Sequence, residues 1–282
     1  MKILIVEAGS SKTDWILVSE AQNLLEFKTS GINPTTQSKS NILSVVEIAK
    51  QNLRNHDIST INFYGAGCKG VGKTMMLEIL QYCFDKTEIV VESDLMAAAR
   101  SSCNGSEGIV AILGTGSHSC LSDGHIILHE KPSLGFLLGD EGSGNAYGKK
   151  LLKAYYYKEM DDELLKKFES DYHFIHENYL SALYSSPKTS FELAQFFPFI
   201  IKNKEDAFIQ KIIQEGMLEF YNQRLSYYNE TSHLPIHIVG NVGIQLQEEY
   251  TLFLRQKGFT FVNFNASPIR GLLQYHSKYV RN

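Results

Sequence analysis

Residues 7–15, with the sequence EAGSSKTDW, place an acid and a turn of small residues directly after the apolar stretch 2–6. Such a turn leaves backbone N–H groups beside a carboxylate, and glycine lets the backbone approach a ligand closely. The pattern is that of an ordinary hairpin, or of a loop that holds a phosphate beside a magnesium ion. In the second case Glu7 is the acid that holds the ion. The residues that would contact the phosphates are Gly9, Ser10, Ser11 and Lys12.

Two further turns of glycine and small polar residues also follow apolar strands. They are GTGS at 114–117 and GNVG at 240–243. The turns at 9–12 and 114–117 predict two loops, one in each half of the chain, that grip a nucleotide's phosphates from both sides. The third turn would receive the nucleoside. The nucleotide contacts predicted from the turns at 114–117 and 240–243 are Gly114, Thr115, Gly116, Ser117, Gly240 and Asn241.

A competing pattern lies at residues 67–74, where GCKGVGKT fits the P-loop pattern G-x-x-x-x-G-K-[ST]. In a P-loop the backbone wraps the phosphates, the lysine neutralises them and the hydroxyl residue binds Mg²⁺. An apolar strand precedes the match, and a helix can follow it. Taken alone, this match favours a P-loop ATPase.

Asp94 and Gly216 are two further candidates for site residues. Asp94 stands at the end of a predicted strand, immediately before a helix. A carboxylate in this place orients an acceptor hydroxyl and takes its proton, so Asp94 is the candidate general base. The alternative is that Asp94 is the N-cap of the helix. Gly216 lies inside a helical run, where glycine costs about 1 kcal/mol relative to alanine. Either a close approach by adenine or helix packing would explain it.

The predicted elements fall into two halves. The first half has the order βββαβαβα, with strands at 2–6, 14–20, 24–30, 61–66 and 88–93 and helices at 38–54, 73–84 and 94–102. Three strands restart the pattern at residue 108, and after Gly142 the chain is predicted to be helical for nearly 90 residues. Strands within 235–243 and at 259–264 precede a final helix, which Ser267 and Pro268 open. We therefore expect a first domain at 1–107 and a second at 108–266 with a helical insertion.

The composition excludes several classes of protein. The 282 residues are 43% hydrophobic and 21% charged with a net charge of −4, which favours neither nucleic acid nor an anionic membrane as a partner. No apolar run reaches the roughly 20 residues needed to span a bilayer, and the N-terminal KILIVEAG is too short for a signal peptide. The four cysteines are widely spaced, as in a reduced protein. We expect a cytoplasmic location.

With these motifs in this order, the sequence resembles the sugar kinase, heat-shock ATPase and actin superfamily. Within it, the chain is similar to the N-acetylglucosamine kinase and BadF/BadG-type ATPase family. The resemblance spans essentially the whole chain and is carried by EAGSSKTDW (7–15), SGINP (30–34), ESDLMAAAR (92–100), ILGTGSHSCL (112–121), LGFLLGDEGSG (135–144), VGNVG (239–243) and SPIRGLL (267–273).

The resemblance implies an α/β fold with two RNase-H-like (actin-like ATPase) domains around a central cleft. The last helix, at about 267–282, would pack back on the first domain. In this frame the match at 67–74 lies away from the expected nucleotide site, so we interpret it as fortuitous.

The resemblance also implies a kinase that uses ATP and Mg²⁺ to phosphorylate the 6-hydroxyl of N-acetylglucosamine or a close amino sugar. Asp94 would be its general base and Glu7 its metal residue. Sugar contacts are implied for Asn33, Ser133, Leu134, Gly135 and Asp140. Leu134 stands where the animal enzymes have Trp, and His118 where relatives often have Asn. The implied partners are a small-molecule sugar and, as in many relatives, a second copy of the chain in a homodimer.

Three other functions stay open. One is an ATPase that activates another enzyme; related activases hold an iron–sulfur cluster on cysteines of two subunits, and closely spaced cysteines are missing here. Another is a non-catalytic sugar sensor on the same fold. The last is the P-loop ATPase.

Overall fold

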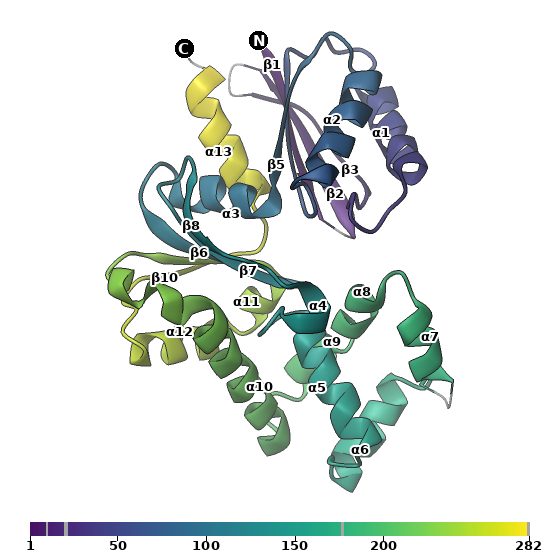
Figure 1. Ribbon diagram of the computed structural model, residues 1–282, viewed down its shortest axis with the longest axis vertical. Coiled ribbons are helices and arrows are strands. Elements are labelled where there is room, and N and C mark those ends of the chain that lie inside the picture. Colours follow the sequence, from purple (N-terminus) through teal and green to yellow (C-terminus); the bar gives the residue numbers. More distant parts are fainter. Residues whose placement is uncertain (10, 20–21, 176–177, 281–282) are drawn as a thin grey trace. The chain divides into compact units, whose positions relative to one another are not determined.

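The computed structural model describes residues 1–9, 11–19, 22–175 and 178–280. The chain forms two compact units (Figure 1). The first comprises Met1–Val110, Ser122–Leu128 and Ser267–Asn282, and the second Ala111–Leu121 and His129–Ala266. This division assigns residues 108–110 and 122–128 to the first unit, and the domain limits drawn from the sequence remain a proposal.

The first unit contains a five-stranded sheet with the order β3-β2-β1-β4-β5. Its strands are β1 (Lys2–Ala8), β2 (Lys12–Ser19), β3 (Gln22–Ser30), β4 (Thr60–Gly65) and β5 (Glu88–Ser93). The first three form an antiparallel meander, and β4 and β5 run parallel to β1. The three parallel strands therefore end at one edge of the sheet, where β1 also turns into β2.

The strand β1 supplies a core to each face of this sheet. Leu4 and Val6 pack with α1 (Lys39–Leu53) and α2 (Val71–Cys83). Ile3 and Ile5 pack on the opposite face with α3 (Asp94–Cys103) and α13 (Ile269–Val280), and Figure 1 shows these two pairs of helices on the two faces. Successive side chains of a strand point to opposite faces, so one apolar run builds both cores. The last helix thus belongs to the first unit.

A second five-stranded sheet has the order β10-β9-β6-β7-β8. Its strands are β6 (Gly108–Leu113), β7 (Ser117–Ser122), β8 (Ile127–Lys131), β9 (Ile236–Val239) and β10 (Val262–Asn265). Counted from β8, the strands appear as third, second, first, fourth and fifth of their half, as in the first sheet. This repeated order is that of two RNase-H-like domains, which confirms the predicted α/β fold class.

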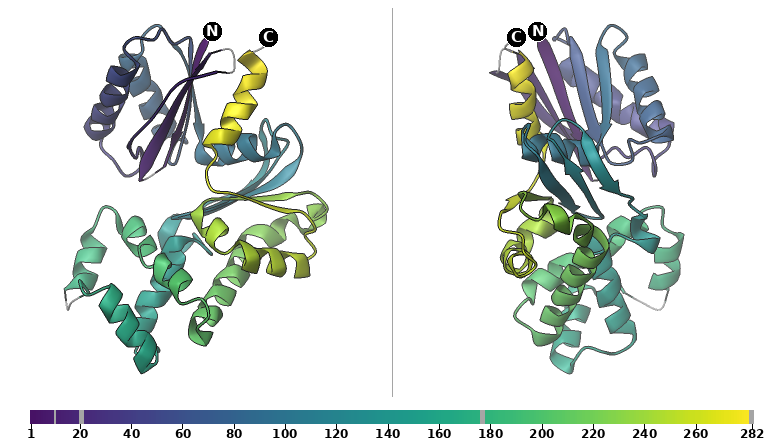
Figure 2. Two further views of the ribbon diagram at one scale, coloured as in Figure 1. Left: turned by 180° about the vertical axis from the view of Figure 1, so that it is seen from behind. Right: turned by 60° about the vertical axis from the view of Figure 1, so that its left-hand side comes forward.

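A long run of helices separates β8 from β9. Figure 2 shows the helices of this run, coloured teal to green, as one group in both views. The run comprises α4 (Gly135–Leu138), α5 (Gly144–Tyr156), α6 (Asp162–Asp171), α7 (Tyr179–Ser185), α8 (Thr189–Ala194), α9 (Phe197–Lys202), α10 (Ala207–Phe220), the π-helix η1 (Tyr221–Leu225) and the 3₁₀-helix η2 (Ser226–Thr231). Two further helices, α11 (Asn241–Gln245) and α12 (Gln247–Gln256), connect β9 to β10.

The predicted order of strands and helices is confirmed, and some strand boundaries differ by two or three residues: β2 begins at Lys12 and not at residue 14, and β10 begins at Val262 and not at residue 259. The strand predicted from residue 108 ends at Leu113, and the strand within 235–243 ends at Val239. In both cases the glycine turn that follows is not part of the sheet, because its backbone forms a loop and not the hydrogen-bonded ladder between strands. No helix in the described part of the chain is long and apolar enough to cross a membrane.

Candidate functional site

Glu7 and Asp94 both lie at the shared carboxyl edge of the first sheet. The register pairs Glu7 with Tyr64 of β4, and Tyr64 with Glu92 of β5. Asp94 follows β5 as the first residue of α3. The two carboxylates are close enough for Asp94 to raise the pKa of Glu7. The fold therefore brings together two acids that are far apart in the sequence.

Glu7 occupies a place that disfavours its negative charge. Burial raises its pKa to about 7, the carboxylates of Asp14 and Asp94 act in the same direction, and Lys12 opposes them. The Ser267 hydroxyl lies 3.5 Å from Oε2 of Glu7 and donates to it. A cation beside Glu7 would relieve this strain.

Asp14 is a buried acid that the motifs did not single out. It pairs directly with Glu7 across β1 and β2. Its side chain is 6% exposed, and its Oδ2 lies 3.0 Å from Nζ of Lys12. The signal was present in the sequence, since a hairpin that turns at 9–12 must place residues 7 and 14 opposite each other.

These residues fit a magnesium ion that is bound together with a nucleotide. Mg²⁺ usually takes one or two carboxylates and completes its shell with phosphate oxygens and water. Within the described residues, no group of three His, Cys, Asp or Glu side chains is arranged to hold a metal ion alone. Glu7 with its raised pKa thus suits a metal ion that arrives with phosphate.

The turn 9–12 is tied to the loop 31–35. The first two N–H groups of the loop donate to the carbonyls of Ser11 and Gly9, both at 3.2 Å. The Gly9 N–H itself closes the turn on the Lys12 carbonyl at 2.9 Å, so this amide is used within the hairpin. Ser10, also predicted to contact phosphate, lies outside the described residues.

Asn33 is the polar centre of that loop. Its Oδ1 accepts hydrogen bonds from the Thr35 N–H at 3.0 Å and the Thr35 hydroxyl at 2.6 Å, which closes an Asx turn. A Cβ on Gly67, which has a φ of +76°, would overlap Oδ1 of Asn33. A Cβ on Gly72 would overlap the Gly67 carbonyl. The glycines of the P-loop-like match thus serve the packing beneath Asn33, which explains them without a phosphate.

Ser93, and not Asp94, is the N-cap of α3. The Ser93 hydroxyl accepts the Met96 N–H at 3.2 Å, as a capping side chain does. The Asp94 carboxylate accepts the N–H of Leu95 at 2.9 Å. The capping interpretation of Asp94 is therefore wrong. Its position in the first turn still places it at the end of the helix dipole that favours a negative charge.

In the second unit, Asp140 ties the turn 114–117 to the start of α5. Asp140 is 6% exposed. Its Oδ1 accepts the Ser117 N–H at 3.2 Å, and its Oδ2 accepts the Asn145 amide at 2.8 Å. That amide also donates to the Thr115 carbonyl at 2.7 Å. Asn145 was not predicted, because only the folded turn reveals that its side chain bridges two loops.

Two features of this cluster indicate a binding site. Asp140 has a φ of +62°, a conformation that is uncommon for non-glycine residues and that clusters at functional sites. The Ser117 hydroxyl and Oδ1 of Asn145 are buried, and within the described residues neither has a hydrogen-bond partner. Buried polar atoms are normally paired, so these atoms suit a polar ligand such as a phosphate.

The turns at the ends of β6 and β9 meet in the folded chain. Gly240 has a φ of +122°, and a Cβ there would overlap the Leu113 carbonyl. A pocket of about 190 Å³ opens beside the two turns. Its lining comprises Gly114, Thr115, Gly144, Phe191, Ala194, Gln195, Phe197, Pro198, Asn241 and Val242. The mainly apolar wall from α8 and α9 was not predicted, because no motif marks these residues.

Gly216 does not line this pocket. It is buried in α10, and a Cβ there would lie 2.5 Å from Cε1 of Tyr147 on α5. Helix packing therefore accounts for this glycine, as the second of the two interpretations had it.

The predicted sugar segment around Leu134 lies on the surface of its unit. Ser133 is exposed, Leu134 is 56% exposed, and Gly135 begins the short helix α4 with a φ of +69°. His118 of β7 contacts Glu130 of β8, with 2.9 Å between Nε2 and Oε1.

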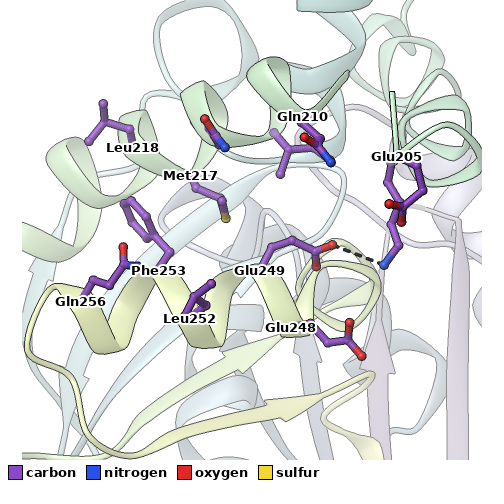
Figure 3. Close-up of a pocket in the computed structure, with 12 residues that line it drawn as sticks. Glu205, Gln210, Met217, Leu218, Glu248, Glu249, Leu252, Phe253 and Gln256 are labelled. Atoms are coloured by element: carbon purple, nitrogen blue, oxygen red, sulfur yellow. Dashed lines mark hydrogen bonds and ion pairs between the residues drawn. The ribbon is translucent and has the colours of Figure 1, made fainter. Parts of the chain in front are cut away.

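A larger groove of about 610 Å³ lies elsewhere, between α10 and α12 (Figure 3). Met217, Leu252 and Phe253 form its apolar floor, and Lys204 pairs with Glu249 at 3.3 Å. None of the predicted site residues lines it. The groove is therefore distinct from the candidate site.

Comparisons with known structures support this fold. A candidate N-acetylglucosamine kinase from Porphyromonas gingivalis is 34% identical, with 98% of this chain and 99% of that chain covered and a TM-score of 0.91. A second candidate from Chromobacterium violaceum is 19% identical, covering 97% and 98% at a TM-score of 0.74. A ROK hexokinase from Thermus thermophilus is 13% identical, covering 100% and 99% at 0.58. No protein-family model and no curated protein matches the chain.

The two repeated sheets, together with the similarity to the Porphyromonas protein, define a member of the sugar kinase, heat-shock ATPase and actin superfamily. The identity and coverage of the Porphyromonas protein go further. The chain belongs to the N-acetylglucosamine kinase and BadF/BadG-type ATPase family.

The buried charge of Glu7 predicts a pH-dependent stability. An ionised Glu7 destabilises the folded state, so stability present below about pH 4.5 is lost as the pH rises through about 7. Glu7→Gln removes this loss. Its advantage over wild type in the free energy of unfolding should therefore grow by about 2 kcal/mol between pH 5 and pH 8. Urea denaturation without magnesium or nucleotide measures this.

The control is Glu47→Gln on the exposed side of α1, whose difference from wild type should stay constant over the same pH range. A constant difference for Glu7→Gln as well would contradict the burial of its charge.

The packing of residues 67–74 predicts that Lys73 does not bind phosphate. Its Nζ lies 3.6 Å from the Glu92 carboxylate. Lys73→Ala should leave the Kd for Mg-ATP within about twofold, whereas Lys12→Ala should raise it about tenfold, as expected for the loss of one charged contact. Titration calorimetry of both variants decides. Loss of binding in Lys73→Ala alone would restore the P-loop interpretation.

Proposed function

We propose that this protein transfers the γ-phosphoryl group of ATP to the 6-hydroxyl of N-acetylglucosamine or a closely related amino sugar. One observation carries the proposal. Each of the two sheets has a turn of glycine and hydroxyl residues between its first and second strands, at 9–12 and 114–117. The first sheet also carries Glu7 and Asp94 at the edge where its parallel strands end. Membership of a family that contains candidate N-acetylglucosamine kinases supports the choice of substrate.

The nucleotide would use both turns and the pocket beside β9. Ser11 and Lys12 are the proposed phosphate contacts of the first unit, and the turn 114–117 holds those proposed for the second. The unpaired Ser117 hydroxyl supports a phosphate contact there. The apolar wall from α8 and α9 suits a purine, with Asn241 at its polar side. Magnesium, bound with the phosphates next to Glu7, would supply charge neutralisation.

The acids would divide the remaining tasks. Asp94 would accept the proton of the attacking hydroxyl. Asp140 and Asn33 would bind the sugar hydroxyls, together with the segment 133–135. Among the described residues, each oxygen of Asp140 accepts one hydrogen bond. A carboxylate oxygen has two lone pairs, so both can accept a further one. Proton transfer and phosphate positioning would together account for the reaction.

A cytoplasmic location and a homodimer belong to the same proposal. The activase alternative is weakened because all four cysteines are buried as free thiols, so none is presented to a second subunit. A sugar sensor would bind the same ligands without turnover. Formation of a sugar phosphate therefore distinguishes the kinase from the sensor.

The role of Asp94 yields the test. Asp94→Asn should lower the rate of sugar 6-phosphate formation by about 10²–10⁴-fold, because a general base contributes that much. The Kd for Mg-ATP should stay within about threefold. Phosphorus NMR identifies the product and its position on the sugar, and calorimetry gives the affinity.

The matched control is Glu88→Gln, an exposed acid at the opposite end of β5, which should keep the wild-type rate. A phosphorylated sugar formed at an unchanged rate by Asp94→Asn would refute its role as base. Absence of any sugar phosphate with the wild-type protein would refute the kinase itself.

A further inference from the structure

The segment 132–138 has no apolar core of its own. None of its side chains is buried, and Leu137 and Leu138 are 78% and 77% exposed. The helix α4 inside it is a single turn without buried residues. Apolar burial normally fixes the position of a short element, and here it does not. Other contacts must therefore hold this segment, which carries Ser133, Leu134 and Gly135.

Arg224 makes the first of these contacts. It lies in the π-helix η1, a form of helix that is rare and often occurs at functional sites, and it is 2% exposed. Its Nη1 donates to the Pro132 carbonyl at 2.7 Å, and its Nε donates to Glu141 at 3.0 Å. A Cβ on Gly139 would lie 3.1 Å from its Nη2. One guanidinium thus contacts the first residue of the segment and Glu141, which lies three residues beyond its last.

The backbone of Arg224 is tied to the second sheet. The Ser119 hydroxyl of β7 donates to the Arg224 carbonyl at 3.2 Å, which links η1 to the sheet. A buried arginine retains its place only when its donors are paired, because an unpaired buried charge is strongly destabilising. The position of the segment is thereby coupled to the sheet through one side chain.

Lys149 of α5 makes the second contact, at the middle of the segment. Its Nζ donates to the Phe136 carbonyl at 2.6 Å. Burial lowers the pKa of this lysine, while the Asp140, Glu141 and Glu219 carboxylates favour its charged form. Its neighbour Lys150 points elsewhere and pairs with Glu219 at 2.8 Å.

We infer that Arg224 and Lys149 are positioning residues for the sugar, because they hold the surface segment 132–138 in a single place. The claim that these residues affect sugar binding rests on the proposed function. The claim that they hold the segment rests on the contacts of Arg224 and Lys149 alone. Neither side chain is assigned a contact with substrate. Each acts through the backbone of the segment.

The consequence is a selective effect on the sugar. A lysine at position 224 keeps the charge but lacks the planar fork, so it cannot reach the Pro132 carbonyl and Glu141 together. Arg224→Lys and Lys149→Met should each raise the KM for the sugar about tenfold and leave the KM for ATP within twofold. A general loss of stability would not separate the two substrates in this way.

Hydrogen exchange of the full chain tests the positioning without any substrate. The amide of Gly139 donates to the Gly135 carbonyl at 2.8 Å and reports whether the segment is held. Peptides covering 133–139 should exchange at least fivefold faster in Arg224→Lys and in Lys149→Met. Lys150→Met, one residue along the same helix, should match wild type in exchange and in both KM values. If Arg224→Lys does not fold, the exchange rates and KM values of Lys149→Met alone test the inference.

The two readouts distinguish the possible failures. Unchanged exchange in the folded variants would overturn the inference, whatever the enzyme does. Faster exchange with equal changes in both KM values would overturn the role in sugar binding. Faster exchange in a protein whose wild type phosphorylates no sugar would support the positioning role and refute the proposed function.

Discussion

The candidate site in the first unit depends on one constraint, the common end of the parallel strands β1, β4 and β5. A residue that follows any of these strands must lie at the same edge of the sheet, where ligands of open α/β sheets bind. Glu7, the turn 9–12 and Asp94 meet there although the chain between them is long. Burial at this edge raises the pKa of Glu7, and the neighbouring carboxylates of Asp14 and Asp94 add to the effect. The second sheet repeats the strand order, so its turns at 114–117 and 240–243 meet for the same reason.

The buried acids Glu7 of the first unit and Asp140 of the second have opposite surroundings. Glu7 is buried beside other carboxylates, so its charge is unfavourable until a cation arrives. Asp140 is buried among donors, the Ser117 N–H and the Asn145 amide, so its charge is satisfied. The first arrangement suits a residue that binds a metal ion reversibly. The second suits a residue that shapes a loop, and Asp140 would present the remaining lone pairs to a ligand. Two buried acidic residues thus have different roles, which their surroundings decide.

Local patterns predicted the elements well, because alternation in strands, helical periodicity and glycine turns are properties of short segments. The fold class followed from their order. The features that could not be predicted depend on contacts between distant segments. They are the hydrogen bond from Asn145 to Thr115, the contact of Arg224 in η1 with Pro132, and the packing of the Tyr147 ring beside Gly216. The P-loop-like match shows the converse, since a motif that fits a pattern can owe its glycines to packing. Asp14 was within reach of the sequence through hairpin pairing alone.

The central claim is that ATP turnover depends on an amino sugar. ADP release from Mg-ATP by the purified protein measures this directly, with N-acetylglucosamine, N-acetylmannosamine, N-acetylmuramic acid, glucosamine, glucose and no sugar as the panel. The account predicts release that requires one N-acetylated amino sugar and is near zero without sugar. Equal release with and without sugar would contradict it in favour of an ATPase, and absence of release with every sugar would contradict it in favour of a sensor.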